Sequence, residues 1–254
     1  CMRGAEMLPL VGWTGANDWR GDLPWELMPH SINPHAGKLV SANHRIIPTT
    51  DDVYLGNIWI AGWRALAIHD ALDAWEATGV RVGIDENEAL QMDFRCVPGE
   101  HFRNFFSSNQ MKLENTQQLS ETELAGLHEL VAWDGRMEAD SVGATLYELT
   151  SDAVADLVFE SLLGRNKVID SGYGAKDRMM SAERLLQMAK GHGIDSSLRG
   201  RSELKNGVMT TVLDALAQPS SWYLPNDDAV PVMAQALRIA CAYLEAKLGE
   251  DVSE

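Results

Sequence analysis

Residues 141–163 read SVGATLYELTSDAVADLVFESLL, and the apolar side chains of this stretch are spaced as on one face of a helix. They recur at intervals near 3.6 residues. The positions are Val142, Leu146, Leu149, Ala153, Leu157 and Leu162. We therefore predict a long amphipathic helix from Ser141 to Leu163.

The stretches around this helix are also helical in pattern. Ser120 is followed three residues later by Glu123, and Asp85 by Glu88, and each pair has the spacing of a capping box at a helix start. Pro231 lies in the first turn of the last predicted helix. The helices that we predict cover residues 65–77, begin at 85 and 120, and cover 181–191, 202–217 and 228–248. The chain after Arg64 is therefore expected to be a helical domain, residues 64–254.

Residues 1–63 have a different composition. They hold five of the eight tryptophans together with many Pro and Gly residues, which interrupt long helices. The one clean extended stretch is Lys38–Ala42, which we predict as a short strand. We expect residues 1–63 to form loops and short strands, so the fold class predicted for the whole chain is mainly α with an irregular N-terminal part.

Composition restricts the partners. The 254 residues include 21 Lys and Arg against 37 Asp and Glu, so the formal net charge is −16. Phosphate backbones repel so acidic a chain, and no nucleic-acid partner is expected. No apolar run approaches the roughly 20 residues that span a bilayer, so no membrane insertion is expected.

The residues alone contain no complete catalytic machine. Cys1, Cys96 and Cys241 form neither a disulfide framework nor a zinc motif, although a free N-terminal Cys such as Cys1 can be a nucleophile. The seven histidines include no His-x-x-x-His pair on a predicted helix. The chain also lacks a Gly-x-Ser-x-Gly elbow and a phosphate loop.

Several motifs in order along the chain carry a family resemblance. They are Gly12-Trp13-Thr14-Gly15, Asp18-Trp19-Arg20-Gly21, Asn33-Pro34-His35-Ala36-Gly37 with Ser41-Ala42-Asn43, Tyr54-Leu55-Gly56, Gly62-Trp63-Arg64-Ala65, Gln91-Met92-Asp93, and Leu130-Val131-Ala132-Trp133-Asp134-Gly135. Together they resemble the penicillin acylase (penicillin amidase) family of N-terminal-nucleophile hydrolases. The resemblance covers about residues 8–165, and beyond that only the helical character agrees.

The resemblance implies the fold and chemistry of the whole protein. The family has an α+β fold, an αββα sandwich with an added helical domain, and residues 1–63 would belong to the sandwich. Its members are precursors that cut themselves, and the exposed N-terminal Ser attacks an acyl amide with its own α-amine as base. That Ser lies outside this chain, which we expect to be the middle-to-late part of the large (β) subunit, truncated at both ends. Cys1 is then the first residue of a piece, and the piece alone is expected to be inactive.

Two residues match the family's active site. By this match Asn43 is the side-chain amide that stabilises the tetrahedral oxyanion; the alternative is a turn residue that closes the strand at 38–42. Arg64 resembles the family's active-site Arg, which orients the groups around it; the alternative is a structural salt bridge at a helix start.

The remaining expectations also follow from the resemblance. Many members hold a structural calcium, for which Asp51, Asp52 and Asn57 are the local candidates, although an Asp pair in a loop is more often a solvated turn. No cofactor is expected for the chemistry. The implied substrate is a small acyl amide, the implied partners are the small subunit and the N-terminal part of the large subunit, and the implied location is periplasmic or secreted. The rival reading is a non-catalytic helical scaffold or interaction module.

Overall fold

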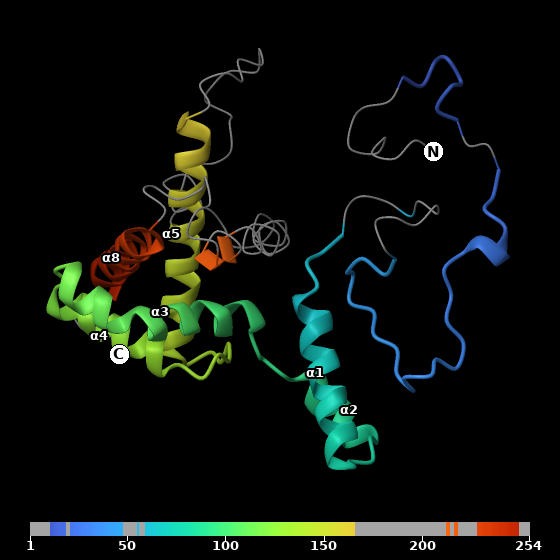
Figure 1. Ribbon diagram of the computed structural model, residues 1–254, viewed down its shortest axis with the longest axis horizontal. Coiled ribbons are helices and arrows are strands. Elements are labelled where there is room, and N and C mark those ends of the chain that lie inside the picture. The colour runs from blue at the N-terminus through green and yellow to red at the C-terminus, as the bar shows by residue number, and fades with distance from the viewer. Residues whose placement is uncertain are drawn as a thin grey trace. The chain divides into compact units, whose positions relative to one another are not determined.

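A computed structural model of the chain describes residues 11–18, 21–47, 55, 59–165, 212–213, 216–217 and 228–248. The chain forms two compact units, Cys1–Leu90 and Gln91–Glu254 (Figure 1). The first long helix among the described residues begins at Trp63, and the division of the chain into residues 1–63 and 64–254 stays a prediction. The assignment of residues 1–63 to a hydrolase sandwich stays a prediction.

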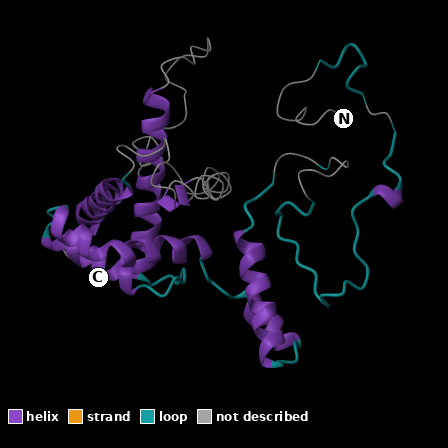
Figure 2. Cartoon of the chain, viewed as in Figure 1, coloured by secondary structure: helices purple, strands orange, loops and turns teal. Residues whose placement is uncertain are grey.

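Helices dominate the described residues, as the colouring of Figure 2 shows. They are η2 (Trp25–Leu27), α1 (Trp63–Thr78), α2 (Ile84–Gln91), α3 (Val97–Thr116), α4 (Glu121–Ala132), α5 (Val142–Arg165) and α8 (Ala229–Leu248). Helix makes up 61% of this part of the chain, which confirms the mainly α fold class. No helix among the described residues is long and apolar enough to cross a membrane.

Most helix predictions that fall on described residues are confirmed. The predicted helices at 65–77, 141–163 and 228–248 are α1, α5 and α8. The capping box at the start of α4 is also present: the Glu123 N–H donates to Ser120 Oγ at 3.2 Å, and the Ser120 N–H donates to Glu123 Oε2 at 2.9 Å. The prediction at 181–191 lies outside the described residues, as does most of 202–217.

The predicted capping box at Asp85 and Glu88 is wrong. Helix α2 begins at Ile84, so Asp85 already lies within its first turn. The residue before the helix is Gly83, whose N–H donates to Glu86 Oε2 at 2.7 Å. Gly83 and Glu86 have the same three-residue spacing as Asp85 and Glu88, and Glu86 accepts an N–H that has no partner within the helix. The helix therefore starts two residues earlier than the pair Asp85 and Glu88 suggested.

The structure differs from the sequence-based prediction in two further places. Lys38–Ala42 is not a strand, because a strand needs a neighbouring strand to share its backbone hydrogen bonds and residues 38–42 have none in the described part of the chain. Helix α3 was not predicted as a separate element, although Pro98 and Glu100 lie in its first turn, where both residue types are favoured.

In unit 2, helices α3, α4, α5 and α8 enclose one hydrophobic core. Helix α5 packs against α8 and α4, and α4 also contacts α3 and α8. The largest fully buried side chains are Phe102, Phe106, Leu113, Leu127, Leu130, Leu146, Val154, Met233 and Leu237. Each such side chain stabilises the fold by about 1.5–3 kcal/mol relative to exposure, so this core accounts for the stability of the unit.

Unit 1 has far less apolar burial. Its described residues include three buried hydrophobic side chains, Ala42, Ile47 and Ala65. Gly79 ends α1 in the left-handed conformation, with a φ of 69°, and the Val80 N–H donates back to the Trp75 carbonyl at 2.9 Å. Two of the three buried residues, Ala42 and Ala65, are sequence neighbours of the predicted site residues Asn43 and Arg64.

Candidate functional site

The structure brings the two predicted catalytic residues into direct contact. Arg64 is the second residue of α1, and its Nη2 donates to Asn43 Oδ1 at 2.6 Å and to the Ala42 carbonyl at 3.3 Å. Ala42 is buried, whereas the side chains of Asn43 and Arg64 are exposed. The contact therefore presents both polar groups at the surface of unit 1.

The backbone of Asn43 has an uncommon conformation. Its φ is 60°, in the left-handed region that Asn tolerates better than most residues. Its carbonyl accepts a hydrogen bond from the Ile60 N–H at 3.0 Å. Asn43 therefore does occupy a bend, as the alternative reading required, but this bend does not close a strand.

The contact with Arg64 also sets the orientation of the Asn43 amide. A guanidinium group has only N–H donors, so the Asn43 atom that it meets must be the oxygen. The NH₂ group, Nδ2, consequently faces away from Arg64. Within the described residues Nδ2 donates to no acceptor.

A lysine attaches the same loop to helix α1 at a second place. Lys38 Nζ donates to Asp73 Oδ1, and to Glu76 Oε2 at 2.9 Å. The hydrogen bonds with Asp73 and then Glu76 raise the pKa of the Lys38 ammonium above its ordinary value, so the ammonium stays charged at neutral pH. The segment from Lys38 to Asn43 is thus bonded to α1 near both of its ends.

A third attachment follows Asn43. The guanidinium carbon of Arg45 lies 5.5 Å from the centroid of the Trp59 ring, which is a cation–π geometry. Trp59 directly precedes Ile60, which donates to the Asn43 carbonyl. These two contacts hold residues 43–45 beside residues 59–60.

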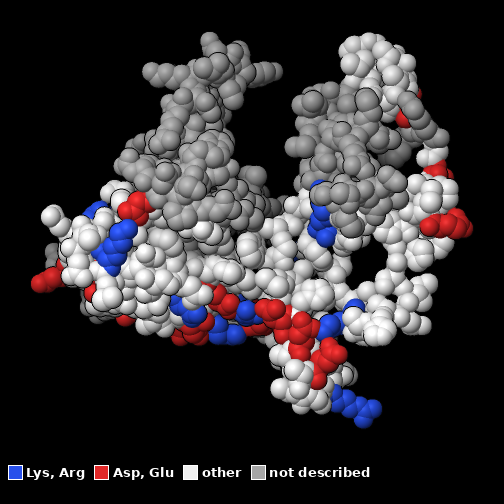
Figure 3. Space-filling view, viewed as in Figure 1, with Lys and Arg blue, Asp and Glu red and all other residues white. Residues whose placement is uncertain are grey.

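The calcium candidates Asp51, Asp52 and Asn57 lie outside the described residues. Among the residues that the structure does describe, no group of three or more His, Cys, Asp or Glu side chains could hold a metal ion. The face drawn in Figure 3 has Lys and Arg side chains lying beside Asp and Glu, with no continuous basic patch on its coloured surface. This distribution agrees with the acidic composition.

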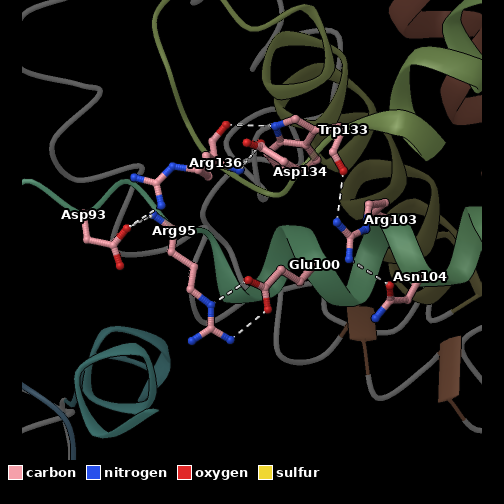
Figure 4. Close-up of polar contacts among 8 residues, drawn as sticks. All are labelled: Asp93, Arg95, Glu100, Arg103, Asn104, Trp133, Asp134 and Arg136. Carbon is pink, nitrogen blue, oxygen red and sulfur yellow. Dashed lines mark hydrogen bonds and ion pairs between the residues drawn. The ribbon is translucent and has the colours of Figure 1, made fainter. Parts of the chain in front are cut away.

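Two motifs of the family resemblance meet inside unit 2 (Figure 4). Arg136 Nη1 donates to Asp93 Oδ1 at 2.8 Å, which joins the segment of Gln91-Met92-Asp93 to the loop after Trp133. The Cys96 N–H donates to the Gly135 carbonyl at 2.8 Å and strengthens this connection. These motif residues therefore have a structural role, since they connect α3 to the loop between α4 and α5.

The sequence model of the family described as Penicillin amidase matches residues 2–254. This chain belongs to the penicillin amidase family. The match confirms the resemblance that the motifs indicated. It also extends over the C-terminal helical part, which contains none of these motifs.

Curated relatives of this penicillin amidase family member are acylases. It is 33% identical over 151 residues to penicillin acylase 2 proenzyme of Pseudomonas sp. (strain SE83), an alignment that covers 59% of the chain and 18% of the relative. It is 29% identical over 168 residues to acyl-homoserine lactone acylase QuiP of Pseudomonas syringae pv. syringae (strain B728a). This alignment covers 63% of the chain and 20% of the relative. The chain spans about a fifth of the length of these relatives.

Sequence reasoning about this family member missed Lys38 and Arg45. Lys38 fell within a predicted strand, and its acidic partners fell on a predicted helix 35 and 38 residues away. No spacing rule connects such positions. The one local signal was the pair Asp73 and Glu76, whose i, i+3 spacing places two carboxylates on the same face of a helix.

Proposed function

We propose that this chain is part of a penicillin-acylase-like amidohydrolase that hydrolyses acyl-amide bonds, with the N-terminal Ser nucleophile supplied from outside these 254 residues. Family membership and the acylase names of the relatives support the reaction class. The word proenzyme in the name of one relative is consistent with a precursor that matures by cleavage. The contact of Arg64 with Asn43 is the observation that carries the proposal.

In the proposed reaction the Ser oxygen attacks the amide carbonyl carbon, and the Ser α-amine accepts the hydroxyl proton. Negative charge develops on the carbonyl oxygen, and Asn43 Nδ2 donates a hydrogen bond to it. The amine then leaves with a proton, and water hydrolyses the acyl-enzyme. An amide N–H suits this task because it is neutral and does not compete for the Ser proton.

Arg64 would orient Asn43 and take no part in proton transfer. Its planar guanidinium has N–H donors in a fixed arrangement, and one of them holds Asn43 Oδ1 at 2.6 Å. Among the described residues no carboxylate pairs with Arg64, and its hydrogen-bond acceptors there are the Asn43 amide oxygen and the Ala42 carbonyl. This arrangement favours the orienting role over a structural salt bridge.

We extend the proposal to the surroundings of the site. The substrate is a small acyl amide, and the partners are the small subunit and the upstream part of the large subunit. The helices of unit 2 would serve as a structural part of the whole enzyme. A periplasmic or secreted location, with a structural calcium in the whole protein, completes the proposal.

The test replaces Asn43 with Gly in the full-length processed protein. Glycine adopts a φ of 60° without strain, so Asn43→Gly removes the amide and spares the backbone. We expect kcat to fall by roughly 10²–10³ and KM to stay nearly unchanged, because the hydrogen bond strengthens only in the transition state. Steady-state kinetics with chromogenic acyl amides and thermal melting of the same sample give both quantities.

Two further variants sharpen this test. Asn43→Asp keeps an oxygen for Arg64 but has no N–H donor, so it should be as impaired as Asn43→Gly. Gln118→Gly is the matched control, because it removes an exposed amide at another residue with positive φ, 51°, far along the chain in unit 2. Full kcat with a lowered melting temperature in Asn43→Gly would remove Asn43 from the active site.

A further inference from the structure

Asn43 lies in a segment that packs little apolar surface. Between Lys38 and Asn43, the Leu39 side chain is 66% exposed, and Ala42 is the buried residue. The segment belongs to no helix or strand. Polar contacts must therefore hold the Asn43 amide where a reacting carbonyl could meet it.

Two of these contacts reach helix α1. Arg64, at the start of the helix, bonds the Asn43 side chain, and Asp73 with Glu76, further along the same helix, bonds Lys38. The Lys38 side chain is 21% exposed, whereas those of Asp73 and Glu76 are 61% and 70% exposed. The lysine side chain is therefore more covered than the carboxylates that it contacts.

We propose that Lys38 is a positioning residue for Asn43, which it holds in register with Arg64 by bridging Asp73 and Glu76. The inference rests on the proposed function, in which Asn43 donates to the oxyanion. Lys38 itself contacts neither substrate nor the reacting atoms. Its effect passes through the Lys38–Asn43 segment, whose two ends are attached to one rigid helix.

The inference predicts a kinetic effect without a large stability effect. A misplacement of about 1 Å at a reacting group can cost 10²-fold in rate. Arg64 and Ile60 would still hold Asn43 without Lys38, so we expect a smaller loss, on the order of tenfold in kcat. The melting temperature should hardly change, because ion pairs whose carboxylates are exposed to solvent contribute little to stability.

The experiment measures kcat, KM and melting temperature of the full-length processed enzyme with Lys38→Met, which keeps the length of the side chain and removes its charge. Lys38→Arg should retain most of the activity, since a guanidinium can bond both carboxylates. The double variant Asp73→Asn/Glu76→Gln should reproduce Lys38→Met from the helix side. Arg81→Met is the control, because Arg81 is an exposed cation of the same unit that forms no ion pair among the described residues.

A double-mutant cycle separates this inference from the proposed function. Lys38→Met should lower kcat in the parent and have no further effect in an Asn43→Gly background, where the positioned amide is gone. An equal loss in both backgrounds, or a parent kcat unchanged by Lys38→Met, overturns the positioning role. If Asn43→Gly alone keeps full kcat, the proposed function fails and this inference fails with it.

Discussion

At the scale of single residues, Trp133 shows how one side chain organises unit 2. Its ring stacks on Tyr147 with centroids 5.1 Å apart. Its Nε1 donates to the Arg136 carbonyl at 2.8 Å, and its own carbonyl accepts from Arg103 Nη1 at 3.0 Å (Figure 4). Through its indole and its carbonyl, Trp133 therefore connects α3, α5 and the loop after α4, and these three segments must approach closely.

Gly143 provides the space for this approach, and Gly143→Ala should be destabilising. A Cβ at this position would lie 2.4 Å from Trp133 Cβ, closer than real contacts allow. We expect the free energy of unfolding to fall by about 1–3 kcal/mol, as for overpacked cores. Urea unfolding followed by tryptophan fluorescence measures it.

Gly12→Ala is the control for this prediction, since a Cβ there would have nothing within 4 Å. Equal stability of the Gly143→Ala and parent proteins would show that the loop around Trp133 can shift without cost.

At the scale of elements, helix α4 depends on its N-cap. Ser120 and Glu123 satisfy each other's backbone N–H groups. Ser120→Ala should lower the free energy of unfolding by about 1 kcal/mol, because one N–H at the helix start loses its acceptor. The measurement is chemical unfolding monitored by circular dichroism.

Ser107→Ala is the matched control, because Ser107 is exposed within α3 and far from either helix end. That change should be neutral or slightly stabilising, since Ala favours a helix interior. If both variants lose equal stability, the cap contributes nothing specific.

The start of α8 should respond to acid. The Val230 N–H, and after it Lys112, hold the pKa of the Asp228 carboxyl below its ordinary value. A carboxyl with a lowered folded-state pKa stabilises the fold above its unfolded value of about 3.9, and this contribution disappears as the pH falls through the folded-state pKa. Acidification below about pH 4 should therefore weaken α8.

Asp228→Asn tests this, because Asn still caps a helix but does not titrate. We expect the parent to be the more stable protein at neutral pH and the difference to shrink below about pH 4. Thermal melting across that pH range would contradict the prediction if the difference stayed constant.

At the scale of the whole molecule, the apolar core and the candidate site belong to different units. The large buried side chains gather in unit 2, whereas Asn43 and Arg64 lie in unit 1, whose described residues bury little. The site therefore depends on polar contacts with α1 for its geometry. In the proposed enzyme, further chain would complete it.

We accordingly predict that the 254-residue chain alone hydrolyses no acyl amide above background, because the proposed nucleophile and its α-amine lie elsewhere. A panel of chromogenic phenylacetyl, glutaryl and fatty-acyl amides would measure this. Turnover that survives repurification and disappears on Cys1→Ala would instead make Cys1 the nucleophile.

The sequence by itself determined the features that depend on neighbouring residues. The helices at 65–77, 141–163 and 228–248 and the cap at Ser120 followed from periodicity and three-residue spacing, which act within one or two turns. The ordered motifs determined the family. Two helix starts with the same three-residue spacing were possible near residue 85. The prediction placed the cap at Asp85, whereas the structure has it at Gly83.

The tertiary structure decided the contacts between distant segments. The local sequence pattern does not identify Lys38 as the partner of the carboxylates on α1, nor the pairing of Arg136 with Asp93, nor the glycine beside Trp133. The strand expected at Lys38–Ala42 is absent for the same reason: pairing needs a second segment, and in the described chain the neighbour of this segment is a helix that offers side chains. Local rules describe the energy of one segment, whereas these contacts depend on which two surfaces the folded chain brings together.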